Sequence, residues 1–278
     1  MMTKVAWLGF FFAALTLITG ASVQMAVAKD LTVQEIVDKT ERVSYYQGKD
    51  GRAKVSMLIT DSQGRKRQRQ FTILRWDQPP PGQEGDDQYR GDQKYYVYFH
   101  RPADVNKMVF MVWKHVDGDD DRWLYLPALD LVKRIASKEK RTSFVGSNFL
   151  YEDVSGRNIN ADTHELVDTT QNYYVIKNTP KEPEAVEFAY FTMWVHRSTF
   201  LPVKIEYYND RGEKYREYEA LKVETIQGLP TVTQARMKDL RVGGETVLQY
   251  RNVQYDIGLP EEIFTERYLR RAPTQHLR

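Results

Sequence analysis

Few residues of this chain stand at the spacings that enzyme chemistry requires. Ser147 follows Gly146, but Phe149 occupies the place of the second glycine, so the strand–turn–helix motif of a serine nucleophile is incomplete. The chain has five histidines, and none has the sequence context of a Ser-His-acid triad. The sequence therefore predicts a protein that is not an enzyme.

Two adjacent carboxylates, Glu152 and Asp153, are the residues that general acid–base catalysis would use. Their surroundings favour a structural role, because basic residues precede them in the chain. We expect one carboxylate to cap a turn and the other to pair with Arg134 or Arg141.

The acidic turn from His115 to Asp121 has the alternating oxygen ligands of a calcium loop, with carboxylates at 117, 119, 120 and 121. It lacks the glycine and the distal glutamate of an EF-hand, and strand-like segments flank it. A solvated hairpin tip is the expected structure. His100 and His196 stand singly within strand-like runs and are interpreted as packing or surface residues. The sequence thus predicts no metal and no cofactor.

The basic run Arg65–Arg69 (RKRQR) has two interpretations. Charge on an edge strand discourages pairing between sheets. The same charges could instead hold the protein against anionic lipid headgroups, as a peripheral membrane contact, or against an acidic partner. Overall, 40 Lys and Arg balance 38 Asp and Glu, which is no signature of nucleic-acid binding.

Large apolar residues recur at alternate positions of neighbouring strand-like runs: Met57, Ile59, Phe71, Ile73, Met111, Trp113, Phe191 and Met193. One interpretation is a filled core. The other is a cavity that binds an apolar ligand, to which flexible methionines are suited. The residues by themselves do not distinguish a filled interior from an open one.

The elements that position these residues are mostly strands. Residues 30–39 predict a helix, because Thr32 and Glu35 form a capping box before an apolar stripe. Alternation then predicts antiparallel strands joined by short turns, at 52–60, 69–76, 94–100, 107–113, 123–126, 131–135, 165–167, 172–177, 189–197, 201–208, 214–224, 231–239 and 246–255.

Two other segments have distinct patterns. Residues 108–113 are apolar throughout, so we expect that strand to be covered on both faces. Residues 78–92 are rich in Pro, Gly and Asp and predict a loop, whereas 260–269 predict a short closing helix.

The first residues have the pattern of a targeting segment. A basic start at Lys4, an apolar run over 5–20 and the small residues Ala26 and Ala28 predict a cleaved signal peptide over 1–28. No cysteine is present, which excludes a lipid-modified cysteine, disulfides and thiolate metal sites. We therefore expect an exported, soluble protein with one domain over 29–278.

The central stretch 123–153 carries a family resemblance. It reads WLYLPAL at 123–129, KRIAS at 133–137 and FVGSNFLYED at 144–153. These motifs resemble those of the LolA-like family of outer-membrane lipoprotein-sorting proteins, in which aspartate is common where this chain has Asn148. The resemblance covers nearly all of the expected domain, and this stretch is its most specific part.

The resemblance implies a mainly β (α+β) fold: one strongly curved antiparallel sheet, an open half-barrel whose concave face is covered by the N-terminal helix and a loop. It implies a periplasmic carrier that binds lipid or lipoprotein acyl chains, with an RND-type inner-membrane transporter as partner. An envelope sensor or adaptor of the same fold, acting on a membrane transporter, is the alternative. Beside the apolar set, the binding residues would be Trp123, Tyr125, Arg134, Arg141, Phe144, Gly146, Phe149 and Tyr151, with the two arginines at the rim.

Overall fold

The structure is a computed structural model that describes residues 30–78 and 91–278. Within it, residues Thr32–Arg278 form one compact unit. The predicted signal peptide and most of the predicted loop at 78–92 lie outside the described residues, so both stay predictions. In the described ranges, no helix combines the length and the apolar character needed to cross a membrane.

Thirteen strands in the described part of the chain form a single antiparallel sheet, and every predicted strand is present, with ends that differ by a few residues. The strands are β1 (Asp50–Thr60), β2 (Lys66–Asp77), β3 (Gln93–Arg101), β4 (Val109–Lys114), β5 (Asp121–Leu126), β6 (Leu131–Arg134), β7 (Asp162–Thr169), β8 (Tyr173–Pro180), β9 (Tyr190–His196), β10 (Pro202–Tyr208), β11 (Lys214–Ile226), β12 (Leu229–Asp239) and β13 (Glu245–Tyr255).

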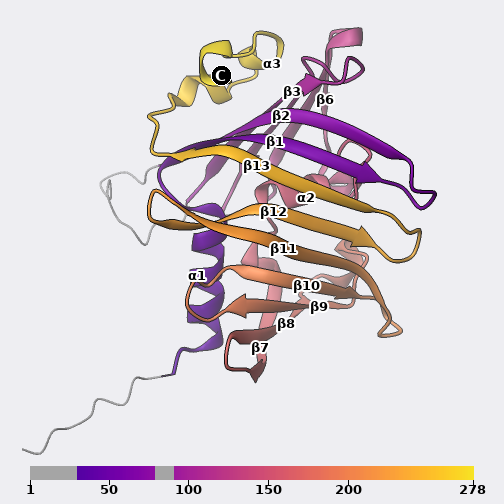
Figure 1. The fold of residues 1–278 in the computed structure, drawn as a ribbon, viewed down its shortest axis with the longest axis vertical. Helices are drawn as coiled ribbons and strands as arrows, with labels where there is room; N and C mark the ends of the chain where they lie inside the picture. The colour runs from indigo at the N-terminus through magenta and orange to yellow at the C-terminus, as the bar shows by residue number, and fades with distance from the viewer. Residues whose placement is uncertain (1–29, 79–90) are drawn as a thin grey trace, which may run out of the picture. The chain divides into compact units, whose positions relative to one another are not determined.

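Two meanders make up the sheet, and they meet where β1 pairs with β13. The strand order is β6-β5-β4-β3-β2-β1-β13-β12-β11-β10-β9-β8-β7, so β6 and β7 are the two edges although they are neighbours in sequence. The sheet is strongly curved and does not close (Figure 1). This confirms the predicted fold class of an open, curved antiparallel sheet.

The segment from 135 to 161 connects the two edges, and its course follows from the strand order. Because β6 and β7 lie at opposite edges, the chain between them has to cross from one edge to the other. This crossing segment contains the predicted aromatic loop and the short helix α2 (Tyr151–Ser155). It therefore lies against the sheet face that the family resemblance assigns to a cover.

Helix α1 (Val33–Tyr45) begins directly after the predicted cap Thr32 and ends six residues beyond the predicted range of 30–39. The Thr32 side chain accepts a hydrogen bond from the Glu35 backbone, and Glu35 accepts from Thr32, which completes the capping box. Ile36, Val37 and Thr40 form its buried stripe. In Figure 1, α1 lies behind the strands β10–β12, on the same side of them as α2.

Both faces of one half of the sheet are covered. The inner cluster includes Met57, Phe71, Phe99, Phe110 and Phe144. Four consecutive residues, Val109–Val112, are fully buried, which confirms that β4 is covered on both faces.

The outer cover is the C-terminal segment. It contains 3-10 helix η5 (Glu261–Phe264), helix α3 (Arg267–Arg270) and 3-10 helix η6 (Thr274–His276), so the predicted short helix at 260–269 is present as two pieces. Its Leu259, Ile263 and Phe264 pack on outer-face residues of β2 to β5. The remaining 3-10 helices are η1 (Pro127–Leu129), η2 (Ser137–Glu139), η3 (Ile159–Ala161) and η4 (Pro183–Ala185).

Candidate functional site

A cavity of about 400 Å³ lies between the inner face of the sheet and its cover of α1 and the crossing segment. Its size falls within the roughly 300–1,000 Å³ of small-molecule sites. Strands from both meanders contribute apolar side chains to it, which include Ala53, Met57, Phe71, Ile73, Val97, Phe191, Met193, Ile205, Met237, Leu248 and Val253.

Partial exposure of inward-facing residues shows that the interior is not completely filled. Ile73, Phe191 and Ile205 lie on the inner face and line the cavity, and each is only half-buried. In a close-packed interior such side chains would be fully buried. The exposed part of their apolar surface is what a ligand would cover, and removing it from water would contribute about 25 cal/mol per Å².

The crossing segment places two aromatic residues in the cavity wall. Ser143 and Leu150 form an antiparallel bridge, and the Phe144 amide donates to the Phe149 carbonyl at 2.8 Å, so residues 143–150 form a small hairpin, here called the cover turn. Phe144 and Phe149 are both buried and both line the cavity. The Phe144 ring lies 5.4 Å from that of Phe110 and 5.9 Å from that of Phe99.

The predicted basic run on β2 holds the cover turn. Arg69 donates to the Val145 carbonyl at 3.1 Å, and Arg67 donates to the Gly146 carbonyl at 3.3 Å. Val145 and Gly146 have φ of 46° and 78°, which is why a glycine suits the tip of the turn. Part of the basic run thus contacts the protein's own cover.

Asn148 is the residue that replaces the common aspartate, and it ties the cover turn to β13. The buried Thr246 hydroxyl accepts from the Asn148 amide at 3.0 Å and donates to Asn148 Oδ1 at 2.8 Å. An asparagine therefore anchors the turn without a charge.

A buried ion-pair network lies beside the cavity, on the crossing segment and its neighbours. Arg141 contacts Glu152 and Glu187, each at 2.6 Å, and lies over the Phe188 ring. Burial opposes ionisation of Glu152, but Arg141 and Arg157 outweigh it and hold the pKa of this carboxyl below its ordinary value. The expected pairing of one carboxylate with Arg141 is therefore present.

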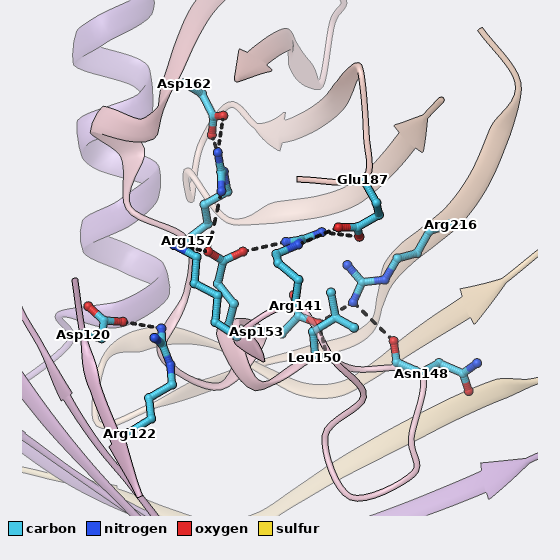
Figure 2. Close-up of polar contacts among 12 residues, drawn as sticks. Asp120, Arg122, Arg141, Asn148, Leu150, Asp153, Arg157, Asp162, Glu187 and Arg216 are labelled. Atoms are coloured by element: carbon cyan, nitrogen blue, oxygen red, sulfur yellow. Dashed lines mark hydrogen bonds and ion pairs between the residues drawn. The ribbon is translucent and has the colours of Figure 1, made fainter. Parts of the chain in front are cut away.

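Two further pairs extend the network, as Figure 2 shows. Arg157 binds both oxygens of Asp162, at 2.8 and 2.9 Å. Arg216 contacts Asp153 and donates to the Asn148 carbonyl at 3.2 Å. Asp153 also caps α2, because it accepts from the Leu150 amide at 2.7 Å. Arg141, Arg157 and Arg216 in this network are thus each matched by an acidic side chain of the protein.

Eight of the predicted site residues line the cavity: Met57, Phe71, Ile73, Arg141, Phe144, Phe149, Phe191 and Met193. Three others lie near it without lining it. Ile59 and Tyr151 are packed in the inner cluster, and Gly146 is at the tip of the cover turn.

Four predicted residues lie on the opposite face of the sheet, which corrects the expectation of a common inner face. Phe110 pairs with Val97 and Leu124 and faces inward, so the next residue, Met111, faces outward with Trp113, Trp123 and Tyr125. The C-terminal segment covers them. The reason is the pairing register, because a shift of one residue exchanges the two faces of a strand.

Arg134 is not at the cavity rim. It lies on the edge strand β6, is largely exposed, contacts Asp121 and stands over the outer-face Trp123 ring. Of the two predicted rim arginines, the structure therefore places only Arg141 in the cavity wall.

Several cavity residues were absent from the sequence-based set. The tyrosines among them are Tyr45, Tyr207, Tyr218 and Tyr250, and the apolar ones include Met237 and Leu248. Tyr218, Met237, Leu248 and Tyr250 lie in the strand-like runs 214–224, 231–239 and 246–255. The alternation of apolar residues in these runs is the sequence signal that could have identified them. The pairing register of strands β7 to β13 is needed to decide which alternate positions face the cavity.

The residues considered for chemistry have structural partners. The Ser147 hydroxyl exchanges hydrogen bonds with the backbone of Phe149. His115 lies between Asp92 and Asp121, at 2.8 and 3.2 Å, and Asp120 pairs with Arg122. Among the described residues, no three His, Asp or Glu side chains gather as metal ligands would.

His100 and His196 each have a threonine hydroxyl as a hydrogen-bonding partner. His100 shares a hydrogen bond of 2.8 Å with the Thr72 hydroxyl, and His196 contacts Thr199 at 3.1 Å. Burial lowers the pKa of His100, which favours its neutral form.

Solved structures share this fold. A DUF1329 family protein from Desulfovibrio piger is 28% identical, with a TM-score of 0.74 over 85% of this chain and 98% of the other. A putative outer membrane lipoprotein-sorting protein domain from Vibrio parahaemolyticus is 25% identical, with a TM-score of 0.74 over 85% and 97%. A LolA superfamily protein from Nitrosomonas europaea, 20% identical with a TM-score of 0.64 over 86% and 100%, shows the fold alone.

The open curved antiparallel sheet is thus the fold of the LolA-like class, as the sequence resemblance implied. A family model described only as an uncharacterized protein matches residues 91–271, which is more than half of the chain. The chain belongs to that family, DUF1329. No curated protein matches it.

Proposed function

We propose that this protein is a periplasmic carrier that binds the acyl chain of a lipid or lipoprotein in its cavity and transfers it between membranes. The observation that carries the proposal is the apolar cavity between the sheet and its cover. The lipoprotein-sorting description of the Vibrio parahaemolyticus structure supports the same class of cargo. Transfer by binding requires no reaction, which agrees with the absence of a recognisable catalytic motif in the sequence.

The cavity wall supports an acyl chain in particular. Met57, Met193 and Met237 come from three strands and line the same space. Methionine side chains are unbranched and adapt to chains of different shape. Burial of each methylene group would contribute about 0.8 kcal/mol, so a chain of ordinary length provides ample binding free energy.

The first experiment is organic extraction and mass spectrometry of the protein purified from periplasm without detergent. We expect a near-stoichiometric amphiphile, which would also identify the cargo. A blank extract together with no uptake of a fluorescent fatty acid would overturn the carrier proposal.

A cavity-filling variant provides a matched test. Ile205→Trp adds volume at a half-buried position inside the cavity and should reduce fatty-acid uptake severalfold while the fold is kept. Val223→Trp is the control, because Val223 lies on β11 with 41% of its surface exposed. Equal uptake by both variants would show that lipid does not enter this cavity.

The export signal at 1–28, the domain over 29–278 and the RND-type partner are parts of this proposal. A periplasmic location would follow from the predicted signal peptide, and cell fractionation tests it. A protein found only in the cytoplasm would contradict the proposed transfer between membranes.

A further inference from the structure

Four tyrosines face one another across the cavity. Tyr45 is on α1, Tyr207 on β10, Tyr218 on β11 and Tyr250 on β13, and all four line the cavity. Asp153, from the crossing segment, lines it as well. Elements far apart in sequence thus bring five oxygen-bearing side chains to one apolar space.

The hydroxyl groups of these tyrosines are unused by the protein. Within residues 30–78 and 91–278, none of the four has a hydrogen-bond partner, and none is sealed away from the cavity space. Tyr207 is only 8% exposed, and its hydroxyl oxygen keeps contact with the cavity space. Buried hydroxyls are almost always hydrogen-bonded, because an unpaired one costs about 1–3 kcal/mol. Tyr45, Tyr218 and Tyr250 are intermediate in exposure, so the four hydroxyls open onto the cavity, where a bound ligand would supply their partners.

The four phenols are uncharged hydrogen-bonding groups. Burial raises the pKa of all four phenols, and the Asp153 carboxylate raises each further, although Arg216 acts the other way at Tyr207; the pKa of Tyr207 and of Tyr250 reaches about 12. The phenols are therefore neutral donors at any physiological pH.

The charged residues beside the cluster disfavour an anionic ligand. Arg141 and Arg157, two cations of the cavity wall, are already paired with Glu152, Glu187 and Asp162. Among the residues that the structure describes, Arg216 and the Leu150 amide bind Oδ2 of Asp153 and none binds Oδ1, so this second oxygen is an acceptor for a ligand hydroxyl. Arg141, Arg157 and Arg216 are each paired with acidic side chains, so an anionic headgroup would meet the Asp153 carboxylate without one of these three cations to balance it.

We propose that the cavity selects amphiphiles whose polar end is uncharged and carries hydroxyl groups, held by Tyr45, Tyr207, Tyr218, Tyr250 and Asp153. A hydroxyl both donates and accepts, so it can bind the phenols and the carboxylate together. This inference rests on the proposed carrier function and specifies its substrate class.

The test compares three ligands with the same oleoyl chain: monooleoylglycerol, methyl oleate and oleoyl lysophosphatidic acid. The first has free hydroxyls and no charge, the second has only the ester, and the third has a phosphate. We expect monooleoylglycerol to bind delipidated protein at least about fivefold more tightly than either of the other two ligands. A ratio of this size is what roughly one additional net hydrogen bond contributes to affinity.

Tyr218→Phe and Tyr250→Phe remove the hydroxyls and keep the rings. Each should weaken monooleoylglycerol binding about three- to tenfold and leave methyl oleate binding unchanged. Tyr98→Phe is the control, because Tyr98 packs in the outer cluster, away from the cavity.

The outcomes separate this inference from the carrier proposal. If lysophosphatidic acid binds most tightly, or if the phenylalanine variants bind monooleoylglycerol as the wild type does, the hydroxyl preference is wrong and the carrier function stands. If none of the three ligands binds, both are wrong.

Discussion

The buried carboxylate of Glu152 shows how the cover is held at the scale of single residues. It is 3% exposed and has three cations within 4 Å, of which Arg141 is the nearest at 2.6 Å. Removing one member of such a group leaves charge buried without a partner, which is more costly than the net value of the pair.

Glu152→Gln should therefore lower the free energy of unfolding by about 3 kcal/mol at pH 7. The folded-state pKa of Glu152 lies below its ordinary value of 4.5, so its contribution is present above pH 4.5 and is lost as the pH falls through the folded-state pKa. Urea unfolding at pH 7 and near pH 3.5 measures this difference. Glu262→Gln, at an exposed position, is the control, and an equal effect at both pH values would contradict the ion-pair role.

Gly156 is a second residue on which the site depends. It has φ of 79°, and a Cβ there would lie 2.4 Å from Cζ of the cavity residue Tyr45. Gly212 has a similar φ of 74° and nothing within 4 Å, which makes it a matched control.

Gly212→Ala should cost about 1–2 kcal/mol for the left-handed backbone alone. Gly156→Ala should cost more, because the Tyr45 ring also has to move, and ligand affinity should fall with it. Thermal unfolding and lipid titration of both variants measure this. Equal losses of stability, with unchanged affinity, would mean that Tyr45 has room to move.

At the scale of elements, the sheet is covered on both faces by segments from different parts of the sequence. The crossing segment and α1 cover the inner face and leave a cavity, whereas the C-terminal segment fills the outer face. Trp113 Nε1 donates to the Phe264 carbonyl at 2.7 Å, and Tyr96 donates to the Tyr268 carbonyl at 2.7 Å. The outer contact is therefore a packed core that stabilises the strands of the cavity wall.

Phe264→Ala should lower the free energy of unfolding by about 3–5 kcal/mol, because Phe264 is fully buried. The emission of Trp113 should shift to longer wavelength as its surroundings become wet. Urea unfolding followed by tryptophan fluorescence measures both effects, with the half-exposed Leu240→Ala as control. A loss no larger than that of the control would show that the C-terminal segment is only loosely attached.

At the scale of the whole molecule, the cavity links ligand binding to stability. A ligand that binds only the folded protein stabilises it by about 2.7 kcal/mol at a hundredfold excess over its Kd. In a protein of this size, that corresponds to an increase in Tm of roughly 5–10 °C.

We expect the Tm of delipidated protein to rise with the concentration of added monooleoylglycerol by this amount. Scanning calorimetry over a range of ligand concentrations measures it, and the Ile205→Trp variant should show a smaller rise. A Tm that does not change with ligand would contradict a binding cavity in the folded state.

Much of the architecture is determined by local sequence. Thr32 and Glu35 are close in the chain and form the predicted cap, and the alternation of each strand indicates which residues share a face. The continuous apolar run at 108–113 correctly indicated a strand buried on both sides. The cap depends on contacts between residues close in the chain, and the strand patterns depend on whether each face is buried or exposed. Local sequence patterns therefore predict these features.

The tertiary structure alone decided which face of each strand is the inner one and whether the interior is filled. Met111 and Trp113 have the same alternation as Phe71 and Ile73, yet the register of β3 with β4 places them on opposite faces. The four cavity tyrosines lie on one helix and three strands, and only the tertiary fold brings them to one space. A cavity is a small volume left over between many packed elements, and no single segment of the sequence records it.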